Sequence, residues 1–231
     1  MKHKYSIVLL NALPDKKIKS LGNKCLIPVS KKLYLIDYQI KLLNHIFKSP
    51  EIIIIGSFDS KKLKKYIENT FTSKNIKYVE HEIGSTTNIG ASIKAGMSEV
   101  SHTNCWLINS SIVFHKNITE NLKKNLNKSF VVTHNAKGNI GYIVDSHQFL
   151  THCYYDLPNT ILDSLYISSN DFQTFNSIID KDITKLYMFE IINLCLANNI
   201  KIKSIPIPTK SVHYIDSMNS IELLKKKICI I

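Results

Sequence analysis

Short runs of apolar, β-branched residues alternate with longer amphipathic segments in the first half of the chain, and this alternation constrains the fold most strongly. Four such runs predict strands: Tyr5–Leu10, Glu51–Gly56, Ile76–Glu80 and Asn104–Asn109. A run such as EIIIIG suits a parallel strand that is covered on both faces. Apolar residues at helical spacing predict helices between these strands, over Leu35–Phe47, Ser60–Phe71 and Asn88–Val100. This order of elements predicts a doubly wound α/β sheet.

The second half of the chain is less regular. Strands are expected at Phe130–Thr133, Gly141–Val144 and Ile202–Ile207, and helices at Ile183–Asn198 and Ser217–Ile228. Residues 147–182 carry no clear pattern. The sequence has no flexible linker, repeat or low-complexity block, so we expect a single domain over residues 1–231. Its sheet should be mixed, mostly parallel and flanked by helices.

The basic residues are all lysine, and they outnumber the acidic residues by 30 to 18, which gives a net charge of +12. An AT-rich genome would produce this bias, so one interpretation is a solvated surface shaped by codon usage. Two others stay open: attraction of anionic substrates, and non-specific binding to nucleic acid or an anionic membrane. Specific nucleic-acid recognition is not expected, because arginine and the known binding motifs are absent.

Cysteine usage and hydropathy bear on the compartment. The five cysteines are far apart and form no CxxC pair, which predicts reduced thiols in a cytoplasmic compartment, or in a virion or host cytoplasm if the source is viral. No stretch reaches the roughly 18 apolar residues of a membrane span. Cys229 is third from the end, so the chain does not match a prenylation signal, which needs the fourth position.

Ligands of open α/β sheets bind beyond the carboxyl ends of the strands, so the loops after the first four strands are the candidate site. Residues of these loops and their neighbours form six short motifs. They are LNALPDKK (10–17), NKCLIPV (23–29), LIDYQIKLL (35–43), TNIGASI (87–93), INSSIVF (108–114) and HYIDSMNSIELL (213–224). Neither a GxSxG hydrolase turn nor a close histidine pair for zinc is present among them.

Taken in order, these motifs resemble the sugar-phosphate and choline-phosphate nucleotidylyltransferases over about residues 4–227. The resemblance implies a Rossmann-like nucleotidyltransferase fold. It also implies transfer of a nucleoside monophosphate, with CMP one candidate, from an NTP to a sugar phosphate or phosphocholine. Pyrophosphate would be the second product. A homodimer or a protein complex stays open.

The resemblance also assigns roles to individual residues. Lys24 would balance charge on the α-phosphate, and Lys17 stands where the family has a phosphate-clamping arginine. Asp216 matches a ligand of Mg²⁺, the implied cofactor, and Ser111 stands where the family has its other metal-binding aspartate. The remaining expected nucleotide-binding residues are Leu10, Asn11, Ala12, Lys16, Asn88 and Ser92.

Several departures support a second hypothesis, a catalytically inactive pseudoenzyme that acts as a binding or structural subunit of a virion or biosynthetic complex. Leu13 and Asp15 replace glycines of a loop that would let backbone N–H groups approach the triphosphate. Ser111 is a weaker metal ligand than aspartate, and codon bias does not explain it, because aspartate codons can be equally AT-rich. Structural roles also stay open for four of these residues: helix capping by Asn88, Ser92 and Asp216, and simple solvation of Lys24.

Overall fold

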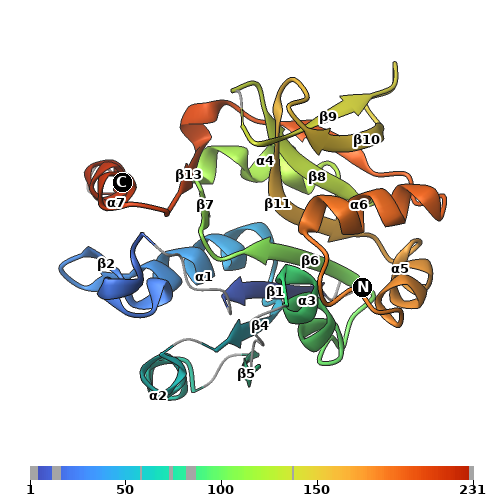
Figure 1. Cartoon of the computed structure of the whole chain (residues 1–231). Coiled ribbons are helices and arrows are strands. Elements are labelled where there is room, and N and C mark those ends of the chain that lie inside the picture. The colour runs from blue at the N-terminus through green and yellow to red at the C-terminus, as the bar shows by residue number, and fades with distance from the viewer. Residues whose placement is uncertain are drawn as a thin grey trace.

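The computed structural model describes residues 5–11, 17–57, 59–72, 75–81, 87–136 and 138–228 (Figure 1). Its centre is a seven-stranded sheet with the order β12-β8-β11-β6-β1-β4-β5. The strands are β1 (Tyr5–Asn11), β4 (Glu51–Gly56), β5 (Ile76–Glu80), β6 (Asn104–Asn109), β8 (Phe130–His134), β11 (Thr160–Ile167) and β12 (Lys203–Pro206). Neighbouring strands are parallel except at β11, which is antiparallel to both β6 and β8. The expected mixed, mostly parallel sheet is confirmed.

The register places the carboxyl ends of the central strands at one level. Asn11 of β1 pairs with Gly56 of β4, and Leu10 pairs with Asn109 of β6. Because β11 runs in the opposite direction, its first residues, and not its last, lie at this edge. Residues that follow β1 and β6 therefore meet residues early in β11.

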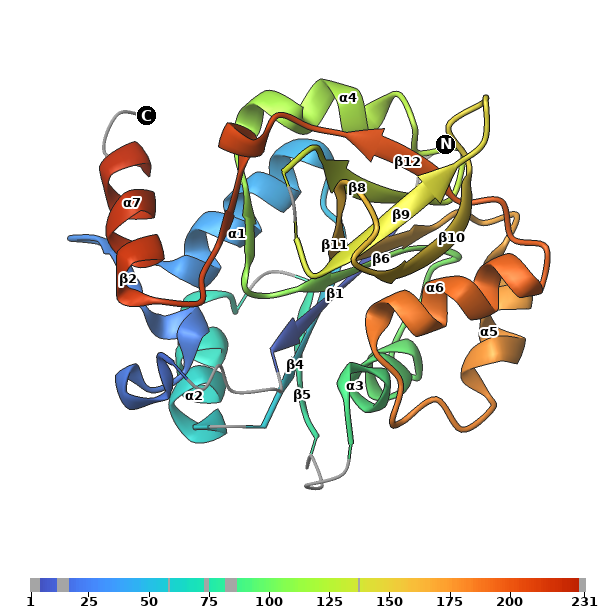
Figure 2. The same ribbon diagram turned by 45° about the horizontal axis from the view of Figure 1, so that its top comes forward.

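Helices cover both faces of the sheet (Figure 2). On one face lie α1 (Leu35–Ile46), α2 (Ser60–Thr70), the short η3 turn (Lys116–Ile118) and α4 (Thr119–Lys123). On the other lie α3 (Ile89–Met97), α5 (Phe172–Ile179), α6 (Met188–Ala197) and the hairpin of β9 (Ile140–Val144) and β10 (Leu150–Tyr155). Side chains of β1 alternate between the faces, with Val8 in one core and Ile7 in the other. The continuous apolar run of β1 is therefore explained by its burial on both faces of the sheet.

A third, smaller core joins the two ends of the chain. It packs α7 (Met218–Ile228) against the segment after β1 and against β7 (Ile112–Phe114) through Ile221, Ile27 and Val113. The hairpin of β2 (Pro28–Ser30) and β3 (Leu33–Tyr34) belongs to this region, and β7 pairs with β13 (Val212–Tyr214). The chain also forms three short 3₁₀ turns, η1 (Lys19–Leu21), η2 (Lys24–Leu26) and η4 (Thr209–Ser211), the last directly before β13.

Two predictions in the second half need correction. The helix expected over Ile183–Asn198 begins at Met188, because backbone carbonyls of Thr184 and Leu186 accept hydrogen bonds from the start of α3 instead of from a helical turn. Tyr187 is extended and Glu190 accepts its N–H at 2.8 Å, which starts the helix there. The patternless residues 147–182 form β10, β11 and α5, and the strand expected at Ile202–Ile207 is shorter, Lys203–Pro206.

Within the described ranges, no helix has the length and apolar character to cross a membrane.

Candidate functional site

Lys24 and Ser111 meet at the carboxyl edge of the sheet. The Lys24 Nζ donates a hydrogen bond to the Ser111 Oγ at 2.7 Å, although the two residues are 87 positions apart. Lys24 lies in the η2 turn, which Asn23 caps by accepting the N–H of Cys25 at 3.0 Å. Both Lys24 and Ser111 are buried, with 8% and 6% of their surface exposed. The lysine is therefore not simply a solvated surface residue, and its ammonium has a fixed position.

A network of neutral polar groups surrounds this pair. The Asn11 Nδ2 donates to the Asn23 Oδ1 at 3.0 Å, and the Ser110 Oγ donates to the Asn11 Oδ1 at 3.0 Å. The Ser110 N–H donates to the Leu10 carbonyl at 3.1 Å. Two predicted nucleotide-binding residues, Leu10 and Asn11, therefore fix the tip of β1 against the segment that follows β6. Their interaction with a nucleotide stays a prediction.

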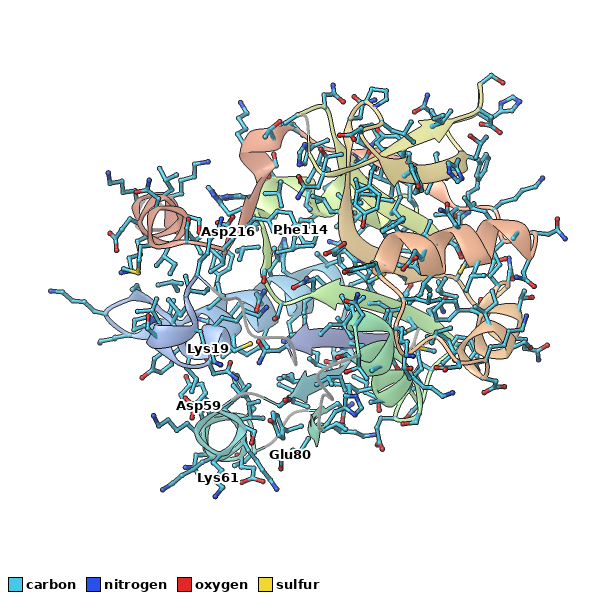
Figure 3. All side chains as sticks on the ribbon, viewed as in Figure 1. Lys19, Asp59, Lys61, Glu80, Phe114 and Asp216 are labelled. Atoms are coloured by element: carbon cyan, nitrogen blue, oxygen red, sulfur yellow. The ribbon has the colours of Figure 1, made fainter. Side chains whose placement is uncertain are left out.

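Asp216 directly follows Ile215, a residue that is hydrogen-bonded to Ser111. The Ile215 N–H donates to the Ser111 carbonyl at 2.8 Å, which extends the pairing of β13 with β7. Asp216 is exposed at the start of α7, on the side of the sheet toward which β1 points (Figure 3). The Ser217 Oγ accepts the N–H of Ser220 at 3.2 Å, so the described capping bond of α7 comes from Ser217 and not from Asp216.

Asp163 of β11 is a carboxyl group at this edge that the sequence did not predict. Its Oδ2 accepts a hydrogen bond from the Asn109 Nδ2 at 3.4 Å, and its N–H donates to the Tyr214 Oη at 3.4 Å. Burial raises the pKa of Asp163, and the Asn109 bond and the positive charge of Lys24 partly offset that rise. Burial and the charge of Asp163 also raise the pKa of Tyr214. A single aspartate inside the apolar run TILDSLYI was the available signal.

Asn88 and Ser92 lie at the start of α3, on the face of the sheet that α3, α5 and α6 cover. The Asn88 Oδ1 accepts the N–H of Ile89 at 2.9 Å, so Asn88 caps α3 as the structural alternative proposed. Ser92 is only 1% exposed, and its Oγ has no hydrogen-bond partner among the described residues. None of the described contacts connects either residue to Lys24. Their nucleotide-binding role remains a prediction.

The first loop is described only in part. Lys17 is exposed at its end, whereas Ala12 and Lys16, together with Leu13 and Asp15, lie outside the described residues. The phosphate-binding role of Lys16 and Lys17 stays a prediction.

The predicted magnesium site has an unfavourable feature. Ser111 stands at the position of the missing second ligand, and its Oγ accepts a hydrogen bond from the Lys24 ammonium. The positive charge of this ammonium would repel Mg²⁺. In the part of the chain that the structure describes, no three His, Cys, Asp or Glu residues are grouped to hold a metal. These residues fit a divalent cation poorly, and the role of Asp216 as a metal ligand stays a prediction.

Neither a protein-family model nor a curated protein matches the sequence. Solved structures do match it over nearly its full length. The CTP:phosphocholine cytidylyltransferase of Streptococcus pneumoniae is 17% identical, with a TM-score of 0.77, and the match covers 98% of this chain and 99% of that one. The inositol-1-phosphate CTP transferase of T. maritima is 11% identical, with a TM-score of 0.74, and the match covers 98% of this chain and 96% of that one.

A UDP-glucose pyrophosphorylase complexed with UDP-glucose is 11% identical, with a TM-score of 0.75, and the match covers 100% of this chain and 99% of that one. At such identities the similarity concerns the fold. The chain therefore has the Rossmann-like fold of the sugar-phosphate and choline-phosphate nucleotidylyltransferases.

Proposed function

We propose that this protein transfers a nucleoside monophosphate from an NTP to a small phosphorylated acceptor. The main support is the buried Lys24, whose ammonium is held beside Ser111 at the carboxyl edge of a nucleotidyltransferase sheet. CMP is the preferred nucleotide in this proposal, because two similar structures are named as enzymes that use CTP. The acceptor would be phosphocholine or a sugar phosphate. Four buried cysteine thiols suit a reducing, cytoplasmic setting.

In the proposed reaction, a phosphate oxygen of the acceptor attacks the α-phosphorus of the NTP. A new P–O bond forms, the bond to the bridging oxygen of the β-phosphate breaks, and pyrophosphate leaves with that oxygen. Catalysis of this kind depends mainly on positioning and charge stabilisation. Lys24 would stabilise the charge on the α-phosphate, and Lys16 and Lys17 would contact the outer phosphates.

Pyrophosphate release from the four NTPs, with a panel of phosphorylated acceptors and with either Mg²⁺ or EDTA, tests this proposal. Replacement of Lys24 by Met should lower turnover by about 100-fold or more, the usual effect of losing one fixed charge-stabilising group. Lys201→Met is the matched control, because Lys201 is exposed and precedes β12, at the amino edge of the sheet.

Full activity of Lys24→Met would remove Lys24 from the mechanism. If the unmodified protein shows no turnover with any acceptor, the pseudoenzyme alternative is favoured. A thermal shift with NTP would then indicate a nucleotide-binding subunit, and no shift would indicate a structural one.

A further inference from the structure

Positive charge is concentrated in the helices on one side of the molecule. Helices α2 and α7 together carry seven lysines and two glutamates, a net charge of +5. Helices α3, α5 and α6, which cover the other face of the sheet, together carry one lysine and one glutamate. Codon usage would spread lysines along the whole chain, so it does not explain this difference. The placement of the charge indicates a role for one particular surface.

Helices α2 and α7 lie on the same side of the molecule as the β2–β3 hairpin (Figure 1, Figure 2). The hairpin joins them, because Val29 packs in the third core with Ile221 of α7, and the Tyr34 ring lies 5.0 Å from the Tyr66 ring of α2. We call this side the lysine-rich surface. Its exposed lysines are Lys31, Lys32, Lys61, Lys64, Lys65 and Lys226.

The lysine-rich surface also exposes large apolar side chains. Met218 and Leu223 of α7 are 52% and 55% exposed. Leu223 and Lys226 are three residues apart and therefore share one face of the helix. The buried Ile221 and Leu224 form the opposite face, which packs in the third core. The outer face of α7 thus combines an apolar side chain with a positive charge.

A bilayer with anionic headgroups matches both features of this surface. Lysines that lie against such a bilayer are attracted to its negative charge. Exposed apolar side chains can enter the boundary between headgroups and acyl chains. The phosphate backbone of a nucleic acid would interact with the lysines but would leave the leucine and methionine in water. Lipid is therefore the partner that accounts for the whole surface.

We propose that the lysine-rich surface docks the protein on membranes that contain anionic lipids. Two ion pairs reduce the charge of the surface only slightly. Lys62 lies 3.8 Å from Asp59, and Lys225 lies 2.8 Å from Glu222, but exposed pairs of this kind are weak. The inference goes beyond the proposed function and does not depend on it, because docking requires neither nucleotide nor acceptor.

Co-sedimentation of the full chain with lipid vesicles at roughly 0.15 M salt tests the proposal. The vesicles contain either phosphatidylcholine alone or an equal mixture of phosphatidylcholine and phosphatidylserine. We expect binding to the mixed vesicles to be tighter by about tenfold or more, because each lysine near an anionic surface adds about fivefold in affinity. Equal binding to both kinds of vesicle, or binding to neither, would overturn the proposal.

Removal of charge locates the docking surface. Lys61→Gln combined with Lys65→Gln, on one face of α2, should weaken binding to the mixed vesicles by roughly 20-fold. The matched control combines Lys181→Gln with Lys185→Gln, two exposed positions between α5 and α6. The control should weaken binding by about twofold or less, because salt screens distant charges. Equal losses in the two double variants would overturn the assignment to this surface.

An apolar substitution distinguishes lipid from nucleic acid. Leu223→Ser should weaken binding to the mixed vesicles by about fivefold or more, because a leucine leaves the lipid interface. Ile143→Ser is the matched control, since Ile143 of β9 is 47% exposed and lies outside the lysine-rich surface. Unchanged vesicle binding by Leu223→Ser would overturn the proposal. Far-UV circular dichroism of each variant separates a lost surface from a lost fold.

Fluorescence anisotropy with labelled DNA and RNA oligonucleotides, in the same salt, provides the last comparison. We expect weaker binding to the oligonucleotides than to the mixed vesicles, and no effect of Leu223→Ser on it. Tighter binding to an oligonucleotide, lost when Lys61 and Lys65 are replaced, would overturn the proposal in favour of a nucleic-acid partner.

Discussion

At the scale of single residues, Glu51 shows how a buried charge is accommodated at the amino edge of the sheet. Its carboxylate accepts hydrogen bonds from the Ser6 Oγ at 2.5 Å and from the N–H and Oγ of Ser101 at 2.9 and 2.8 Å. The Lys77 Nζ lies 3.0 Å away. Burial alone would raise the pKa of Glu51, but these hydrogen bonds outweigh it and lower the pKa to about 2.

The lowered pKa of Glu51 predicts a specific acid sensitivity. Because the folded protein holds this proton less tightly than the unfolded chain, the stabilisation is present above pH 4.5 and is lost as the pH falls toward about 2. Glu51→Gln should lower the free energy of unfolding at neutral pH by up to about 3 kcal/mol. Urea denaturation as a function of pH measures this change.

The exposed Glu222, which pairs with Lys225 one turn along α7, is the matched control. Glu222→Gln should change the stability little, because exposed ion pairs are weak. If the Glu51→Gln variant kept the stability and acid sensitivity of the unmodified protein, the role of Glu51 in both would be excluded.

At the scale of elements, the start of α3 is held by the segment that precedes α6. The N–H groups of Asn88 and Gly90 donate to the carbonyls of Thr184 and Leu186 at 2.8 and 3.1 Å. Gly90 lies so close to this segment that a Cβ atom there would overlap the carbonyl oxygen of Ile183. The contact joins two helices that are far apart in the sequence.

Gly90→Ala distinguishes helix propensity from this close contact. Propensity alone predicts that alanine stabilises α3 by about 1 kcal/mol. The overlap predicts the opposite, a loss of roughly 1–3 kcal/mol in the free energy of unfolding, because backbone must move to admit the methyl group. Chemical denaturation measures the sign. The control is Ala95→Gly in the same helix, where helix propensity alone should act. A stabilised Gly90→Ala variant would contradict the prediction, because it would show that the backbone around Ile183 moves at little cost.

The same elements show what the sequence can and cannot predict. The strands at Tyr5–Asn11 and Glu51–Gly56 were predictable because their side chains are buried on both faces. The late start of α6 was not, because it depends on hydrogen bonds from α3, about 95 residues earlier. The contact between Lys24 and Ser111 confirms that the loops after the first and fourth predicted strands meet, an expectation that came from the carboxyl ends of strands in an open α/β sheet. Asp163 was missed because only the antiparallel direction of β11 brings it to that edge.

At the scale of the whole molecule, the central sheet mixes segments from both halves of the chain. Strands β8, β11 and β12 extend the sheet beyond β6, and the only tryptophan, Trp106 of β6, lies at the junction. Its ring is fully buried, 6.0 Å from the rings of Phe47 and Phe130 and 5.6 Å from that of Phe114. These neighbours come from both sides of the junction, so one core should hold both halves.

This arrangement predicts one cooperative unfolding transition and so tests the expected single domain over residues 1–231. Urea unfolding followed by Trp106 fluorescence and by far-UV circular dichroism should give coincident curves. Measurements at several protein concentrations separate unfolding from dissociation of an oligomer. Two resolved transitions would show that the halves unfold independently.

The insertion of β11 between β6 and β8 has a consequence during synthesis on the ribosome. The segments that form β1, β4, β5 and β6 all emerge before residue 110, but the strand that pairs with the other edge of β6 begins only at Thr160. Until then the nascent chain exposes an unpaired apolar strand, which is the kind of edge that self-associates. Slow or interrupted translation between these points should therefore favour aggregation over productive folding.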